Sequence, residues 1–162
     1  MNKRITAITA GLLAVTALAQ SPKDKGYATI DRATAEAHIG FLASDELEGR
    51  EAGYKSGRIA GNYVLAQLKS LGIQPWNGSS YVQPFEAYRI ERQKKGSYQV
   101  HPDSIAKLNE GVHQKLNLRN IIGMIPGKKS DEYVIIGAHY DHIGMDPLLD
   151  VDQIYNGADD NA

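Results

Sequence analysis

The sequence predicts one α/β domain, and three patterns support this fold class. Apolar residues recur at helical spacing over residues 32–43 and again over about 55–71. Residues 81–88 alternate apolar and polar side chains, as a half-buried strand does. The run Val134-Ile135-Ile136 is apolar on both faces, which indicates a strand buried inside a sheet. At 162 residues, 42% hydrophobic and 23% charged, the chain has the composition of one globular domain.

Charge and cysteine content exclude several classes of protein. The formal net charge is -1, so we predict neither a nucleic-acid partner nor an anionic membrane surface. The chain has no cysteine, which excludes disulfides and zinc sites built from thiolates. Any metal must therefore be held by histidine, aspartate, glutamate or water.

The N-terminal segment, residues 1–19, reads as a signal peptide. Lys3 and Arg4 precede a small apolar run, and Ala17-Leu18-Ala19 is typical of a cleavage site. A membrane anchor is the alternative, but this run is shorter than the about 20 residues that a bilayer requires. We therefore expect export to the periplasm or beyond the cell, with residues 20–162 forming the N-terminal portion of one domain.

Two helices are predicted in the first half of the chain. Residues 21–26 are expected to be extended, and Asp31 to cap a helix over 32–43. The polar loop 45–57 holds several carboxylates and Arg50, which we interpret as solvated or loosely paired charges. A second helix runs from about 55 to 71, and Gly72 ends it.

Strands are predicted after the second helix. Pro84 places the strand 81–88 at a sheet edge, because proline cannot donate a ladder hydrogen bond. Residues 91–115 read as an irregular connection with some strand. A strand over 118–127 and the buried strand over 132–138 follow.

Side chains that can bind metals come directly after the predicted buried strand. His139 and Asp141 lie two positions apart, so in an extended chain they point to the same face. The carboxyl end of such a strand is where open α/β sheets bind ligands. A neutral histidine can give one ring nitrogen to a metal while a carboxylate such as Asp141 orients the other.

A second acidic motif lies further along the chain. Asp159 and Asp160 are adjacent carboxylates without a neighbouring lysine or arginine, and divalent cations would relieve their repulsion. Each motif alone has an ordinary explanation, a surface histidine or an aspartate-rich turn. Together they predict a site for catalytic zinc, manganese or a similar ion.

Both motifs resemble those of the co-catalytic two-zinc aminopeptidase family, which includes bacterial leucine-type aminopeptidases, glutamate carboxypeptidase and glutaminyl cyclase relatives. The similar segments are Ile135–Gly144, Ile154–Ala162, Phe41–Arg50 and Leu118–Gly123. The resemblance implies that His139 binds one zinc and that Asp160 bridges two. It implies that Asp141 is the catalytic residue that orients His139, and that the peptide bond after Asp160 is often cis.

By the same resemblance, the fold is the N-terminal part of a mixed-sheet, three-layer α/β fold like that of the zinc exopeptidases, truncated at Ala162. A glutamate pair and the later metal ligands would lie downstream. The implied function is zinc-dependent hydrolysis of N-terminal peptide bonds, with two zinc ions as cofactors and a peptide as substrate. This chain would be inactive alone. The alternatives are a related zinc carboxypeptidase or deacylase, and a truncated product without catalysis.

Overall fold

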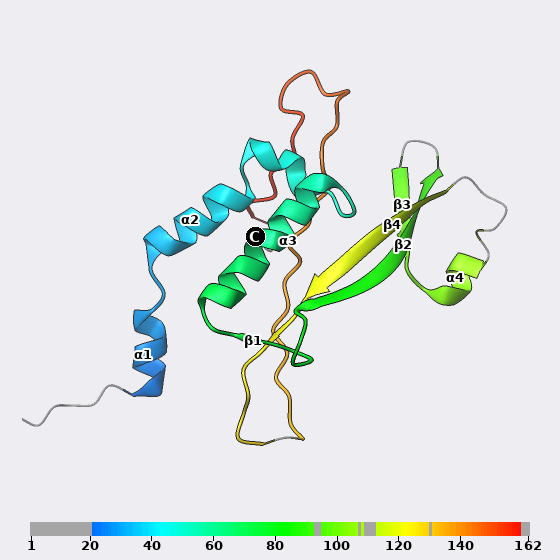
Figure 1. Ribbon diagram of the computed structural model, residues 1–162. Helices are drawn as coiled ribbons and strands as arrows, with labels where there is room; N and C mark the ends of the chain where they lie inside the picture. Colours follow the sequence, from blue (N-terminus) through cyan, green and yellow to red (C-terminus); the bar gives the residue numbers. More distant parts are fainter. Residues whose placement is uncertain (1–20, 93–94, 107, 109–112, 130, 160–162) are drawn as a thin grey trace, which may run out of the picture. The chain divides into compact units, whose positions relative to one another are not determined.

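The computed structural model describes residues 21–92, 95–106, 108, 113–129 and 131–159 (Figure 1). The chain divides into two compact units, residues 1–35 and 36–162. The predicted signal peptide lies outside the described residues. Within the described part, no helix has the length and apolar character needed to cross a membrane.

Helices and short strands are mixed along the chain, as the α/β prediction requires. The helical segments are α1 Pro22–Ala28, α2 Arg32–Leu42, the 3₁₀ helix η1 Asp45–Arg50, α3 Lys55–Ser70 and α4 Pro102–Ala106. The strands are β1 Gln74–Pro75, β2 Val82–Arg92, β3 Lys95–Gln99, β4 His113–Ile121 and β5 Gly123–Met124. The described residues do not form a three-layer fold, so only the coarse class is confirmed.

The prediction of an extended segment over 21–26 is wrong, because this segment belongs to α1. Ser21 accepts a hydrogen bond from a backbone N–H of the first turn at 3.2 Å. Pro22 takes the first helical position, where its missing N–H has no cost. The helix α2 begins as predicted, with the Asp31 carboxylate accepting from the backbone N–H of Thr34 at 2.9 Å.

The second predicted helix is confirmed as α3, which starts at Lys55. Its last turn is followed by Gly72 in the left-handed conformation, at φ +68°. Ala60 is fully buried, and η1 lies against the helix. The ring of Phe41, on α2, stacks on Tyr63 of α3 with 4.4 Å between centroids. These contacts pack α2 and η1 against α3.

A three-stranded antiparallel sheet has the order β3-β2-β4. β3 pairs with β2 only over Tyr88–Arg92, whereas β4 pairs along nearly all of β2. The prediction that this strand lies at a sheet edge is wrong for β2 as a whole, because β2 is the middle strand. At Pro84, opposite Arg119, only β4 pairs with β2 among the described residues, so the missing N–H of proline breaks no ladder hydrogen bond on the side of β3. The cross-strand pair Ala87 and Leu116 is buried. A two-stranded sheet joins β1 and β5.

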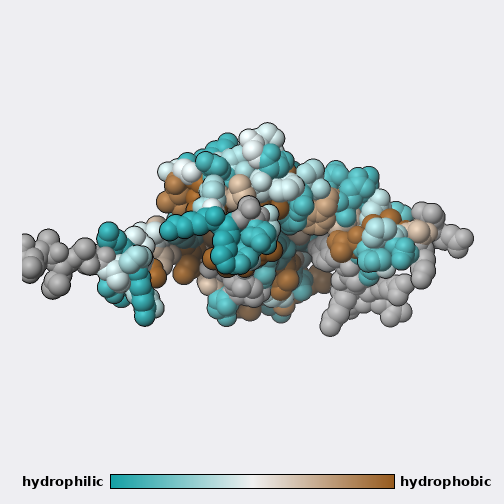
Figure 2. All heavy atoms as spheres, turned by 90° about the horizontal axis from the view of Figure 1, so that it is seen from below, coloured by the Kyte–Doolittle hydropathy of each residue, from teal (hydrophilic) through white to brown (hydrophobic). Residues whose placement is uncertain are grey.

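The predicted buried strand over 132–138 is wrong for this structure. Val134, Ile135 and Ile136 are 93%, 91% and 94% exposed, and no described residue pairs with their backbone in a sheet. A strand that is apolar on both faces is buried only when strands flank it and layers cover it. The described residues supply neither. Figure 2 shows hydrophobic residues, in brown, exposed among hydrophilic ones on the face that is drawn.

Candidate metal centre

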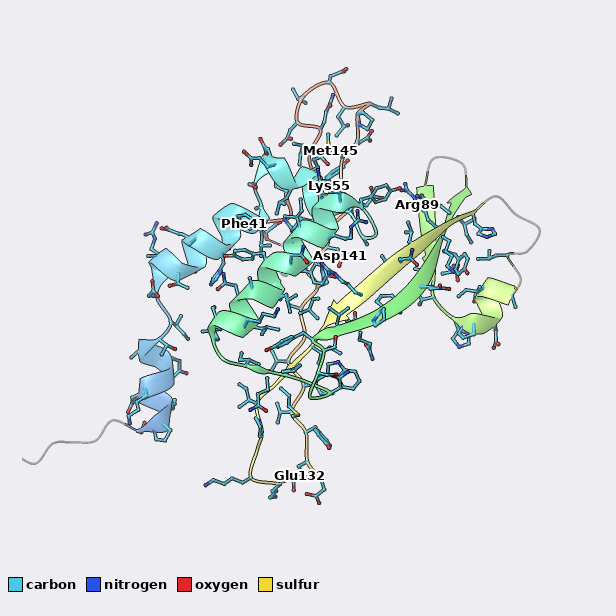
Figure 3. All side chains as sticks on the ribbon, viewed as in Figure 1. Phe41, Lys55, Arg89, Glu132, Asp141 and Met145 are labelled. Carbon is cyan, nitrogen blue, oxygen red and sulfur yellow. The ribbon has the colours of Figure 1, made fainter. Side chains whose placement is uncertain are left out.

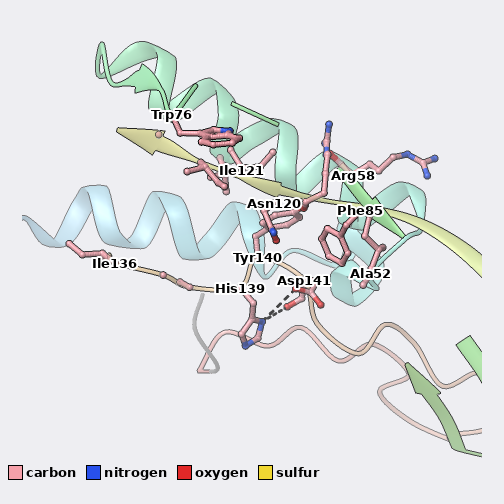
Figure 4. Close-up of a pocket in the computed structure, with 18 of the residues that line it drawn as sticks. Ala52, Arg58, Trp76, Phe85, Asn120, Ile121, Ile136, His139, Tyr140 and Asp141 are labelled. Carbon is pink, nitrogen blue, oxygen red and sulfur yellow. Dashed lines mark hydrogen bonds and ion pairs between the residues drawn. The ribbon is translucent and has the colours of Figure 1, made fainter. Parts of the chain in front are cut away.

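His139 makes a short hydrogen bond within its own motif (Figure 4). Its Nδ1 lies 2.8 Å from the backbone oxygen of Asp141 and 3.9 Å from the Asp141 carboxylate. A carbonyl oxygen only accepts, so Nδ1 must carry the proton, and in the neutral ring Nε2 then has the lone pair. Metal-binding histidines commonly donate their second nitrogen in this way. The role predicted for the Asp141 carboxylate stays a prediction.

The backbone after His139 runs beside η1. The His142 N–H donates to the Arg50 carbonyl at 3.1 Å, and the Gly144 N–H donates to the Gly49 carbonyl at 3.0 Å. A parallel bridge between Glu51 and His142 continues this contact. The histidine motif is therefore fixed against the turn that precedes α3.

The second motif returns to the first through a loop. The Tyr155 N–H donates to the Gly144 carbonyl at 3.0 Å, and Met145 forms an antiparallel bridge with Ile154. Figure 3 shows Met145 on this loop. The segments 139–144 and 154–157, distant from η1 in sequence, thus lie together beside it.

Arg50 joins these segments through its side chain. The residue is 2% exposed, so the prediction that the charges of this loop are solvated is wrong for it. Its Nε donates to the Tyr140 carbonyl at 3.1 Å, and Nη1 donates to the carbonyls of Leu42 and, at 2.6 Å, Asn156. Nη2 donates to the Gly157 carbonyl at 3.2 Å. One guanidinium therefore binds three separate stretches of backbone.

Two ionisable groups of this region have shifted pKa values. Burial lowers the pKa of the Arg50 guanidinium, and the negative charge of Asp141 acts in the opposite direction. Because arginine remains protonated in proteins, a buried positive charge lies near this carboxylate. Burial also raises the pKa of Tyr140, whose hydroxyl donates to the Arg119 carbonyl at 2.7 Å.

Asn156 adds a second connection that the sequence analysis missed. Its side-chain N–H groups donate to the Ala43 carbonyl at 2.7 Å and to the Asp45 carboxylate at 2.8 Å. One feature of the sequence could have indicated this contact: the segment Phe41–Arg50 resembles the same family as the two metal motifs. Because the three segments share this resemblance, Phe41–Arg50 could be expected to lie near the motifs.

Of the two predicted metal ligands, the structure describes His139. Asp159 is exposed, while Asp160 and the peptide bond that follows it lie outside the described residues. No cluster of three or more histidine, aspartate or glutamate side chains suited to a metal occurs among the residues that the structure describes.

An open pocket of about 1060 Å³ lies next to the histidine motif (Figure 4). One side is formed by the exposed segment 133–138. The other includes Trp76, Phe85 and Ile121, and Tyr140 also lines the space. The pocket therefore has mainly apolar walls beside a polar end at His139.

Comparison with protein families finds a match for the last part of the sequence. The sequence model of peptidase family M28 matches residues 120–162, the stretch that contains both metal motifs. This is a family of co-catalytic zinc aminopeptidases, so the resemblance predicted from the sequence is confirmed there. No curated protein and no solved structure matches the chain.

Proposed function

We propose that the chain carries the first part of a two-zinc aminopeptidase site, because the model of peptidase family M28 matches residues 120–162, which contain both metal motifs. The observation that carries the proposal is the hydrogen bond from His139 Nδ1 to the Asp141 carbonyl, because it leaves Nε2 as the metal-binding nitrogen. The reaction is hydrolysis of the N-terminal peptide bond of a peptide.

Three residues of the two motifs have a task in this proposal. His139 would hold one zinc through Nε2, Asp160 would be the ligand that both zincs share, and Asp141 would keep the imidazole of His139 in orientation. Bound zinc would activate a water and polarise the substrate carbonyl.

Zinc content and peptidase activity test the proposal in the full-length polypeptide. His139→Ala and Asp160→Ala each remove a ligand. Loss of an outer-shell partner lowers metal affinity or activity by about 10- to 100-fold, so loss of a ligand should lower bound zinc and the hydrolysis of aminoacyl amides by more than that. His101→Ala is the matched control, because its side chain is 70% exposed and lies outside both motifs. Unchanged zinc and activity in both ligand variants would refute the site.

Substrate choice separates the proposal from its alternatives. An aminopeptidase requires a free amino terminus and accepts a peptide with an amidated carboxyl terminus. A carboxypeptidase has the opposite requirements, and a deacylase cleaves N-acylated substrates. Zinc binding without hydrolysis of any of these would favour the product without catalysis.

A further inference from the structure

We infer that Arg50 is a positioning residue of the metal centre: its side chain fastens the segments 139–144 and 154–157 to the turn that precedes α3. The inference rests on the proposed function, because it concerns how the segment of the ligand His139 and the segment that precedes the acidic motif are held. Arg50 belongs to neither motif. Its assignment comes from the contacts of its side chain and backbone.

The donor geometry explains why this residue is an arginine. The accepting carbonyls belong to Tyr140, which follows His139, and to Asn156 and Gly157, which lead into the acidic motif. A guanidinium presents five N–H donors in a rigid plane, so it can bind carbonyls that lie in different directions. A lysine ammonium has three donors on one atom and cannot replace this arrangement.

Burial makes these contacts costly to lose. Arg50 is 2% exposed, and removing its side chain would take a buried donor away from four half-buried backbone carbonyls. The buried charge also lies near the carboxylate of Asp141, which stabilises it. Loss of the guanidinium would therefore affect both motif segments at the same time.

The backbone around Arg50 is itself held in an unusual conformation. Glu48, Gly49 and Arg50 have φ values of 47°, 66° and 49°, so three successive residues are left-handed. Only glycine adopts this region easily, and strain of this kind persists where the surroundings enforce it, often at functional sites. The turn lets the Arg50 carbonyl accept from the His142 N–H while its side chain binds the same motif segment.

The test compares Arg50→Lys with Arg89→Lys in the full-length polypeptide. Arg89 is the matched control: it is partly buried, comes from β2 and donates to Glu51 and Tyr54 (Figure 3). We expect Arg50→Lys to weaken zinc binding about 10- to 100-fold, as loss of an outer-shell partner does. In the metal-free protein, hydrogen exchange should accelerate in 139–144 and 154–157. Arg89→Lys keeps a positive charge for the Glu51 carboxylate, so it should change neither measurement.

A rescue experiment separates positioning from general support of the fold. In Arg50→Ala, millimolar ethylguanidinium can enter the vacated space and should restore part of the zinc affinity. Ethylammonium carries the same charge without the planar donors, so it should not. The absorption spectrum of bound Co²⁺ should change in Arg50→Ala and return toward wild type with ethylguanidinium.

Three results would overturn the inference. One is wild-type zinc affinity in Arg50→Lys, and another is equal rescue by both cations. The third is faster hydrogen exchange throughout the protein together with normal zinc binding by the folded fraction. This result would mean that Arg50 is needed only for folding. If the wild-type protein binds no zinc, the proposed function fails first and the positioning role fails with it. The exchange pattern of the metal-free protein distinguishes that case from a failure of Arg50 alone.

Discussion

Replacing Gly49 by alanine would disturb the turn that carries Arg50. Gly49 has φ +66°, and a Cβ atom built on it would lie 2.1 Å from the Gly144 carbonyl oxygen and 2.8 Å from that of Tyr155. Both atoms are backbone, so no side-chain rotation can relieve the overlap. The histidine motif would have to move away from η1.

The cost of that movement has two parts. An alanine at left-handed φ costs about 1–2 kcal/mol. Separation would also break the hydrogen bonds from Gly144 N–H to Gly49 and from Tyr155 N–H to Gly144, at about 0.5–1.5 kcal/mol each. Gly49→Ala should therefore lower the free energy of unfolding by about 2–5 kcal/mol.

Urea unfolding measures this loss, with the single tryptophan Trp76 as a fluorescent probe and circular dichroism as a second signal. Gly72→Ala is the matched control, because Gly72 has φ +68° with no atom within 4 Å of the added Cβ. It should show only the conformational cost of about 1–2 kcal/mol. If the two variants are destabilised equally, Gly49 does not hold the motif against η1 and the reasoning is wrong.

Two further predictions concern pH and processing. Burial raises the pKa of Tyr140 above its ordinary 10.0, so its contribution to stability is complete below that pH and is lost as pH rises through the folded-state pKa. The free energy of unfolding, measured by urea titration at several pH values, should thus fall above about pH 10. It should fall less steeply with pH in Tyr140→Phe. The same dependence on pH in both proteins would contradict this. We also propose export, so mass spectrometry of the exported protein should find Gln20 at the N-terminus, and Ala19→Leu should keep the leader attached. A wild-type chain that begins at Met1 would count against export.

Local signals in the sequence were sufficient for the main helices. Asp31 and Gly72 mark a helix start and a helix end through contacts with their own neighbours, and the structure confirms both. The same logic, applied fully, would have found α1, since Ser21 and Pro22 form an ordinary helix start. These features depend on a few adjacent residues, which a sequence displays directly.

The burial of Arg50 could not be predicted in that way. Its hydrogen-bond partners at Tyr140, Asn156 and Gly157 lie 90, 106 and 107 positions away. An arginine in a polar, glycine-containing loop is usually solvated, and nothing local distinguishes this one. The prediction of a buried strand over 132–138 failed because burial also depends on residues outside that segment. The apolar composition of the segment is typical of a buried strand, but burial requires neighbouring strands on both sides as well.

The burial of Arg50 and the exposure of 134–136 together indicate which contacts position the candidate site. Val134, Ile135 and Ile136 have no sheet partner among the described residues, so sheet hydrogen bonds do not place His139 here. The contacts that do place it come from the other direction, through backbone bonds from Gly49 and Arg50 and through the Arg50 guanidinium. The turn before α3 therefore fixes the segments 139–144 and 154–157 without a sheet contact from 134–136. A change in that turn should alter metal binding even where the motifs themselves are intact.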